Sequence, residues 1–125
     1  MSYDLYAEKI ISCYEHPHNK GQIKDANAKF REHNMVCGDD ITVYIKVKNN
    51  LINDAKFTGN GCAISIASAS LITDYIKNKK VDEIEKLDLN KIKELLGIDP
   101  GPARMKCATL ALIAIKHALK NYLTK

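Results

Sequence analysis

The feature that most constrains this fold is an alternating run of apolar and polar residues in ITVYIKVK, residues 41–48. Every second position holds a branched aliphatic residue: Ile41, Val43, Ile45 and Val47. Because successive side chains of a strand point to opposite faces, this alternation predicts a strand with one apolar and one polar face. The apolar face cannot remain in water, so the rest of the chain must cover it.

Two further segments extend this strand into a sheet. Asn49 and Asn50 predict a hairpin turn into a second strand over LINDAKFTG, residues 51–59. A weaker extended segment precedes the alternating strand in ANAKFREHNMV, residues 26–36. Together the three segments predict a three-stranded antiparallel meander with one apolar face.

Two later segments have the length and composition of helices that can cover this face. CAISIASASLITDYIK, residues 62–77, is rich in alanine and serine, whose small side chains allow a helix to lie close to its neighbour. ARMKCATLALIAIKHALKNYL, residues 103–123, has an apolar face opposite a polar face that carries lysines. We therefore predict an α+β fold in which helices pack on one face of a three-stranded antiparallel sheet.

Two shorter helices complete the prediction. Residues 3–15 have helical periodicity that Pro17 ends, and Asp88 is placed to cap a helix that Gly97 closes. The chain has no internal repeat or linker, and two cores in a chain of this length would each be marginal. Residues 1–125 are therefore predicted to form a single domain.

Composition excludes several classes of protein. Hydrophobic residues make up 46% of the chain and charged residues 27%, as in ordinary globular proteins. The longest apolar stretch is far shorter than the roughly 20 residues that span a bilayer, and the N-terminus has no hydrophobic signal core, so we expect a cytoplasmic protein with no membrane partner. The net charge of +4 comes from scattered lysines, and aromatic content is 6%, so no nucleic-acid partner is expected.

Three of the four cysteines lie at predicted junctions between elements. Cys37 precedes the alternating strand, Cys62 lies between a strand and a helix, and Cys107 lies in the first turns of the last helix. Asp39 follows Cys37 by two residues, and glycines beside these positions allow tight turns. In a reducing compartment, three thiolates and one carboxylate form a candidate site for Zn²⁺ or for cluster iron. Because a carboxylate holds cluster iron less firmly than a thiolate, such a site is suited to releasing its contents.

The spacing of the cysteines matches no zinc ribbon, ferredoxin or thioredoxin pattern, but the local motifs are more specific. The four motifs are YAEKIISCYEHPHNKG at 6–21, CGD at 37–39, GNGCAISIASAS at 59–70 and PARMKCATL at 102–110. In this order they resemble the iron–sulfur cluster assembly scaffold family, which comprises IscU, SufU and the NifU N-terminal domain. The resemblance extends over nearly the whole chain.

The resemblance implies a SufE/NifU-like fold and a site of Cys37, Asp39, Cys62 and Cys107 that holds Zn²⁺ or a [2Fe–2S] cluster. It implies a scaffold and sulfur acceptor rather than an enzyme. A cysteine desulfurase of the SufS or IscS type would deliver persulfide sulfur, iron–sulfur acceptor or carrier proteins would receive the cluster, and a homodimer would be able to form on cluster binding. Two residues are candidate persulfide acceptors: Cys107 lies near a helix N-terminus that favours the thiolate, and Cys37 lies on a glycine turn that favours reach. The resemblance to SufU favours Cys37, whereas the resemblance to IscU-type members favours Cys107, and we prefer Cys37.

The motifs are closest to those of SufU, yet the chain lacks the insertion that SufU proteins usually carry before the last cysteine. Lys106 stands where IscU-type members have a histidine, and DPGPARMK at 99–106 replaces their chaperone-recruiting segment, so dependence on that chaperone is not expected. The alternative function is a zinc-bound sulfur-transfer partner of a SufS-type desulfurase that carries no cluster. A zinc hydrolase or deaminase is not expected, because the chain lacks the HxE and CxxC pattern that such enzymes use.

The remaining cysteine and the histidines are interpreted as structural or solvated. Cys13 lies on the apolar side of the first helix and matches no family ligand. Asp40, next to Asp39, is expected to be a solvated or capping carboxylate. The histidines expected in exposed positions are His16, His18 and His33 in loops and His117 on the outer face of the last helix.

Overall fold

The computed structural model describes residues 2–35 and 38–124, and within these ranges helices and strands follow one another in the predicted order. The elements are α1 (Ser2–Glu15), β1 (Ala28–Asn34), β2 (Asp39–Lys48), β3 (Leu51–Asn60), α2 (Ala63–Ile76), α3 (Val81–Glu85), α4 (Leu89–Leu96) and α5 (Pro102–Leu123). One helix, then three strands, then further helices confirms the α+β class.

The three strands form a meander in which β2 is central and pairs antiparallel with both β1 and β3. Asn49 and Asn50, at the turn between β2 and β3, have φ values of 54° and 64°. Asparagine tolerates this left-handed backbone better than most residues, and two-residue hairpin turns require it. The predicted hairpin and the weaker first strand are both confirmed.

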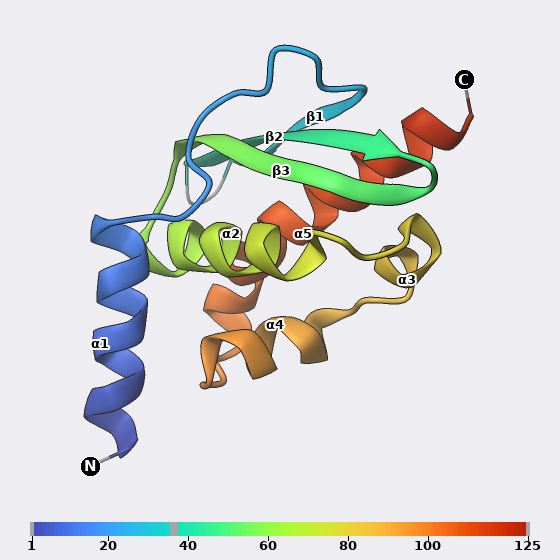
Figure 1. Ribbon diagram of the computed structural model, residues 1–125. Coiled ribbons are helices and arrows are strands. Elements are labelled where there is room, and N and C mark those ends of the chain that lie inside the picture. Colours follow the sequence, from blue (N-terminus) through green and yellow to red (C-terminus); the bar gives the residue numbers. More distant parts are fainter. Residues whose placement is uncertain (1, 36–37, 125) are drawn as a thin grey trace.

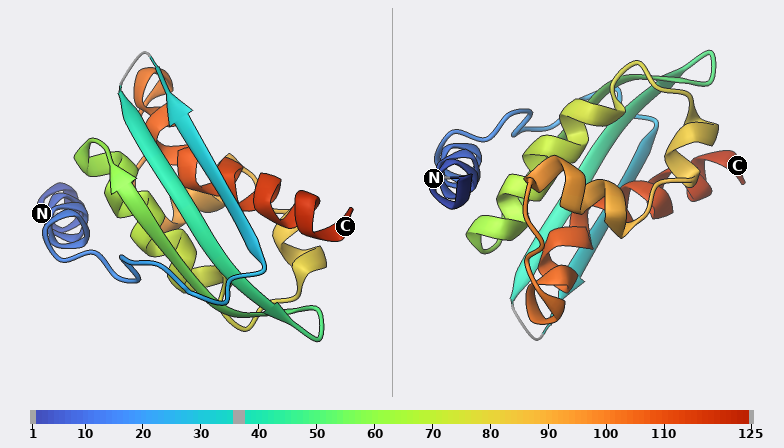
Figure 2. Two further views of the ribbon diagram at one scale, coloured as in Figure 1. Left: turned by 90° about the horizontal axis from the view of Figure 1, so that it is seen from above. Right: turned by 90° about the horizontal axis from the view of Figure 1, so that it is seen from below.

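The sheet forms one layer and the helices cover a single face of it, as Figure 1 shows. Helix α5 packs on β1 and β2, whereas α2 packs on β3 and on α5. Ile41, Val43 and Ile45, the alternating residues of β2, are completely buried under these helices. Burial of each such side chain contributes about 1.5–3 kcal/mol, so the alternation of β2 fixes which face the helices must cover. In Figure 2, α5 crosses behind the strands in the view from above and in front of them in the view from below.

Helix α2 packs between the sheet, α5 and α1, and its small residues allow it to fit among these three neighbours. Ser65, Ala67, Ser68 and Ala69 are all buried, and their short side chains let the neighbouring backbones approach closely. The helix is therefore buried on nearly all sides, which accounts for its weak separation into apolar and polar faces.

The segment after α1 returns along the outer edge of β3. The Gly21 N–H donates to the Phe57 carbonyl at 2.8 Å, and the Phe57 N–H donates to the Asn19 carbonyl at 2.9 Å. Lys20 thereby forms a parallel bridge with Phe57. These bonds pair part of the edge of β3 and hold the end of α1 beside the beginning of α2, as Figure 1 shows.

The connection between α2 and α5 contains two short helices, of which one was predicted. Asp88 caps α4 by accepting the Asn90 N–H at 3.0 Å, and Gly97 ends the helix with φ of 78°, so both predicted caps are confirmed. Helix α3 was not predicted, because a helix of a single turn is too short to show periodicity. It is held by the burial of Val81 and Ile84.

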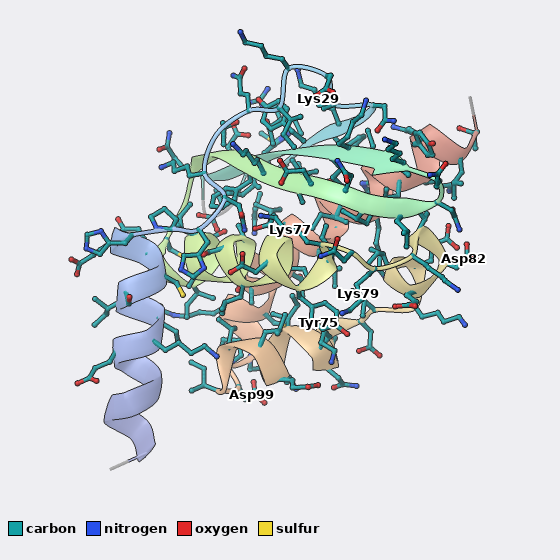
Figure 3. All side chains as sticks on the ribbon, in the orientation of Figure 1. Lys29, Tyr75, Lys77, Lys79, Asp82 and Asp99 are labelled. Carbon is teal, nitrogen blue, oxygen red and sulfur yellow. The ribbon has the colours of Figure 1, made fainter. Side chains whose placement is uncertain are left out.

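Charged side chains of both signs occupy the surface shown in Figure 3. Lys29 lies on β1, whereas Lys77 and Lys79 follow the end of α2. Lys79 and Lys91 both approach the ring of Tyr75, with Nζ atoms 4.9 and 4.8 Å from its centroid. Among the described residues, no helix combines the length and hydropathy needed to cross a bilayer.

Gly59 provides a test of the strand packing. Its φ is +133°, and a Cβ there would lie 2.9 Å from the Asp40 carbonyl carbon and closer still to the oxygen. Gly59→Ala is therefore expected to lower the free energy of unfolding by about 4 kcal/mol or more.

The matched control is Gly101→Ala, at a φ of +84° with no atom within 4 Å of the new Cβ. Backbone strain alone should cost about 1–3 kcal/mol there. Urea denaturation measures both variants, and equal losses would contradict the close approach at Gly59.

Candidate metal centre

Strand β2 presents two adjacent carboxylates to opposite faces of the sheet. Asp39, Ile41 and Val43 occupy alternate positions, so Asp39 faces the helices and is 2% exposed. Asp40 lies on the other face, where Arg31 Nε and Nη2 donate to its carboxylate at 2.9 and 2.7 Å. Hydrogen bonds from Arg31 lower the pKa of Asp40. The sequence suggested that Asp40 is a solvated or capping carboxylate. In the structure it is instead ion-paired with Arg31.

Cys62 lies in the short connection between β3 and α2. It is the N-cap residue of α2, with φ of −70° and ψ of 172°, and its side chain is partly exposed. The preceding Gly61 is required by close approach, because a Cβ there would lie 2.9 Å from the Ser65 Cβ and 3.0 Å from Asp39 Oδ1. Without that Cβ, the end of β3 and the Asp39 carboxylate can meet.

Cys107 lies in the second turn of α5 and is 5% exposed. Helix α5 begins at Pro102, where the missing N–H costs no helical hydrogen bond. The buried Ser65 hydroxyl donates to the Cys107 carbonyl oxygen at 3.2 Å, which joins α2 to α5 beside the site. Sequence reasoning missed Ser65, because no local signal connects it with a carbonyl 42 positions away.

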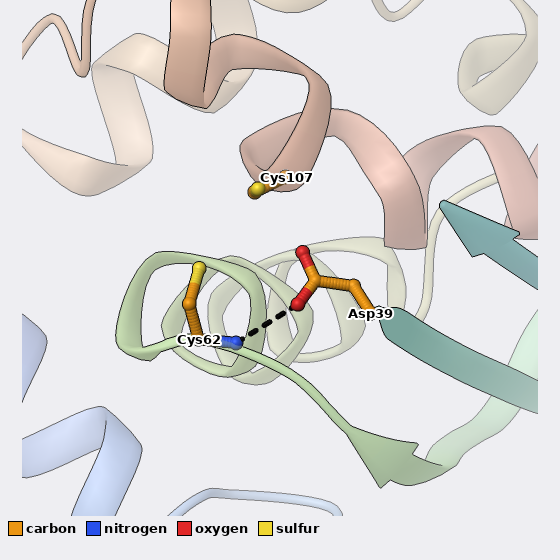
Figure 4. A group of neighbouring side chains, drawn as sticks. All are labelled: Asp39, Cys62 and Cys107. Carbon is orange, nitrogen blue, oxygen red and sulfur yellow. Dashed lines mark hydrogen bonds between the residues drawn. The ribbon is translucent and has the colours of Figure 1, made fainter. Parts of the chain in front are cut away.

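The three side chains converge, although they come from three elements. One ligand atom from each of Asp39, Cys62 and Cys107 lies within 4.8 Å of the others. Asp39 Oδ1 accepts the Cys62 N–H at 3.0 Å, and Figure 4 shows the second oxygen turned toward Cys107. That second oxygen, Oδ2, is buried and has no hydrogen-bond partner among the described residues. Leaving such an oxygen unsatisfied costs about 1–3 kcal/mol, which a bound cation would offset.

The donor set fits a borderline-soft metal. Thiolates favour Zn²⁺ and cluster iron, and a carboxylate oxygen is an accepted ligand of Zn²⁺. The arrangement can therefore hold a metal through two sulfur atoms and one oxygen, and Zn²⁺ would need one further ligand for a tetrahedral set.

The structure brings together three of the four predicted site residues. The fourth, Cys37, lies outside the described residues, so its position as a ligand stays a prediction. Cys13 lies elsewhere, buried between α1 and α2, and burial raises the pKa of its thiol. It belongs to the core, as expected from the sequence.

The histidines are exposed, as predicted, but two of them also have partners. His18 Nδ1 lies 2.5 Å from Asp74 Oδ2, and His117 Nδ1 lies 2.9 Å from Glu32 Oε2. The His117 ring also packs on Phe30, with centroids 4.8 Å apart. His117 thus lies against β1, on which α5 packs, while 47% of its side chain stays exposed to solvent.

Comparison with known proteins shows which family this chain resembles. The family model described as NifU-like N terminal domain matches residues 5–125. Iron-sulfur cluster assembly scaffold protein IscU 1 of Archaeoglobus fulgidus is 39% identical over 97% of this chain and 78% of its own length. Zinc-dependent sulfurtransferase SufU of Bacillus subtilis is 36% identical over 92% of this chain and 89% of its own.

A solved structure agrees with these relatives. A proposed iron-sulfur cluster assembly scaffold protein for the SUF system from Fervidobacterium islandicum superimposes with a TM-score of 0.78 and 29% sequence identity. The match covers 95% of this chain and 99% of that one.

The two adjacent carboxylates offer a matched test of the metal centre. Asp39→Asn keeps an oxygen that can accept the Cys62 N–H but removes the negative charge, so zinc affinity should fall by at least about tenfold. Asp40→Asn, on the opposite face, should change it less than about twofold. Competition with a chromophoric zinc chelator measures both. Equal losses in the two variants would contradict the assignment of Asp39.

Proposed function

This chain belongs to the NifU-like N-terminal domain family, and from that membership we propose that it is a scaffold on which iron–sulfur clusters are assembled. The relatives named as scaffold proteins support this role, and so does the match over nearly the whole chain. The cluster is the cargo of the protein, and the metal centre at the end of the sheet holds it.

The observation that carries the proposal is the unpartnered oxygen of Asp39. This buried oxygen belongs to a group with Cys62 and Cys107 whose ligand atoms lie within 4.8 Å of one another. A purely structural carboxylate in that position would be expected to have both oxygens hydrogen-bonded. One hard ligand among thiolates also suits a site that must release its cluster, because cluster iron prefers sulfur.

Cys37 is proposed as the fourth ligand. It precedes Asp39 by two residues and so adjoins the site in the sequence. With Cys37 the centre would have three thiolates and one carboxylate. These make four ligands, the number that Zn²⁺ takes in a tetrahedral site. The same four residues would hold a [2Fe–2S] cluster as it forms.

Sulfur would reach the centre as a persulfide from a cysteine desulfurase of the SufS or IscS type. A thiolate of the scaffold attacks the terminal sulfur of the donor persulfide, the donor S–S bond breaks, and the donor cysteine leaves as a thiolate. The attacking thiolate must reach its donor, and Cys107 is only 5% exposed. We therefore favour Cys37 as the first acceptor, with Cys107 as the alternative. The exchange is a stoichiometric relay, so the chain acts as a scaffold rather than an enzyme.

The proposal implies further partners. An iron–sulfur acceptor or carrier protein would take the finished cluster, and a second copy of the chain would be able to share it in a homodimer. Conversion of persulfide sulfur to sulfide also needs electrons, which ferrous iron supplies in part and a thiol or protein reductant completes.

A second candidate function is a zinc-bound sulfur-transfer partner that carries no cluster. It is favoured by the similarity to a relative named zinc-dependent sulfurtransferase, and by the SufU-like motifs around Cys62 and Cys107. The same residues would then hold Zn²⁺ permanently, and only sulfur would pass through the protein.

Anaerobic reconstitution separates the two functions. With ferrous iron, cysteine, a desulfurase and a dithiol reductant, the scaffold should gain iron and acid-labile sulfide in equal amounts, with visible absorption from the cluster. Cys107→Ser should lose both, whereas Cys13→Ser should keep them, because Cys13 lies in the core. One tightly held zinc per chain that iron does not displace, with no sulfide, would instead support the zinc-bound function.

The carboxylate ligand predicts a change in cluster transfer. Asp39→Ala removes the hard ligand and leaves the thiolates, so delivery of an assembled cluster to an apo-ferredoxin should slow by about tenfold. Circular dichroism of the ferredoxin cluster follows the transfer. A variant that delivers its cluster as fast as the parent would contradict the role of Asp39 as the labile ligand.

A further inference from the structure

A small pocket lies beside the metal centre, and Gly61, which lines the pocket, directly precedes Cys62. Its volume is about 200 Å³, and its walls come from the end of α1, the segment after it, the end of β3 and the first turns of α2. The lining residues are Tyr14, Lys20, Gly59, Asn60, Gly61 and Ile66. Figure 1 shows these four parts of the chain gathered at one end of the sheet.

The lining is polar and cationic, and it contains no carboxylate. Tyr14, Lys20 and Asn60 are exposed to solvent. In the described part of the chain Lys20 forms no ion pair, and neither the Asn60 amide nor the Tyr14 hydroxyl has a hydrogen-bond partner within the protein. An ammonium, an amide and a hydroxyl are therefore available as donors around one hollow. Their common complement is an anion that accepts several hydrogen bonds.

The backbone that carries Lys20 is fixed more firmly than a surface loop requires. Asn19 Nδ2 donates to Thr73 Oγ1 at 3.0 Å and to Asp74 Oδ1 at 2.8 Å. The His18 N–H donates to Ser70 Oγ at 2.8 Å. With the bridge to β3 on the other side, these bonds fix the backbone of Lys20 beside the pocket, so only the lysine side chain must be ordered when a ligand binds.

The size of the pocket limits its occupant. Pockets for cofactors and drug-sized ligands usually enclose about 300–1,000 Å³, so this one is too small for a nucleotide. It accommodates one side chain or one amino acid, and the anion of that size which proteins and amino acids carry is a carboxylate. The apolar Ile66 can contact the methylene groups beside it.

We propose that the pocket lined by Lys20, Asn60 and Tyr14 binds a carboxylate of the sulfur donor and so aligns the donor with the metal centre. The position beside Gly61 supports this role, since Gly61 immediately precedes Cys62 and lies so close to Asp39 that a Cβ added to it would be 3.0 Å from Asp39 Oδ1. This inference rests on the proposed function, because it assumes that sulfur arrives from a persulfide donor.

Charge reversal at Lys20, compared with a matched lysine, tests the proposal. Lys20→Glu should raise the dissociation constant of the scaffold for a cysteine desulfurase about tenfold, and Lys20→Arg should stay near the parent value. Lys24→Glu changes the net charge equally in the same exposed segment but lies outside the pocket, so it should change the constant less than about twofold. Isothermal titration calorimetry with the complete proteins measures all four.

The metal content of each variant distinguishes failure of this inference from failure of the proposed function. Parent and Lys20→Glu proteins that both load fully, with Lys20→Glu matching Lys24→Glu both in desulfurase binding and in sulfur transfer from cysteine persulfide, would overturn the pocket alone. A parent that takes up neither zinc nor cluster would contradict the proposed function.

Two further experiments identify the molecule that supplies the carboxylate. If it belongs to the desulfurase, replacing one acidic residue near its persulfide cysteine with lysine should restore binding of Lys20→Glu. If it belongs to a free amino acid, Lys20→Glu should slow sulfur transfer from cysteine persulfide about tenfold and leave transfer from the persulfide of cysteamine, which has no carboxylate, unchanged. Absence of both effects would overturn the proposal.

Discussion

The carboxylate of Asp39 is the interaction on which the rest of the metal centre depends. Asp39 is the first residue of β2 and lies on the face of the sheet that the helices cover. Its carboxylate accepts the backbone N–H of Cys62 at the beginning of α2. Its other oxygen is buried beside Cys107 of α5 without a hydrogen-bond partner among the described residues. The Asp39 side chain thus joins β2 to α2. Its second oxygen remains an unsatisfied acceptor, available to a cation, at the point where these two elements meet α5.

The architecture makes this junction possible through close packing. Small residues allow α2 to lie against both the sheet and α5, and the Ser65 hydroxyl links these two helices at the Cys107 carbonyl. Gly61 removes the one Cβ that would separate the end of β3 from Asp39. The centre is therefore positioned by rigid elements, as a site must be to hold several ligands in a fixed geometry.

Those parts of the fold with a strong local signal could be predicted from the sequence. The alternation in β2, the asparagine hairpin and the caps of α4 follow from local chemistry, and the motifs around Asp39, Cys62 and Cys107 pointed to three side chains that the structure brings together. The features that the sequence did not predict depend on contacts between separate segments. They are the hydrogen bond from Ser65 to Cys107, the pairs of Arg31 with Asp40 and of His18 with Asp74, and the pocket at Lys20. Helix α3 was missed because its stability comes from burial rather than from periodicity.

The most direct test of the metal centre is X-ray absorption spectroscopy of the zinc-loaded protein, which counts sulfur and oxygen neighbours of the metal. The proposed ligands predict three sulfur atoms at about 2.3 Å and one oxygen at about 2.0–2.2 Å, with the oxygen contributed by Asp39 lost or replaced by water in Asp39→Ala. The parent and this variant should therefore differ in zinc affinity as well as in the oxygen shell. A shell of four sulfur atoms, or one without sulfur, would contradict the account.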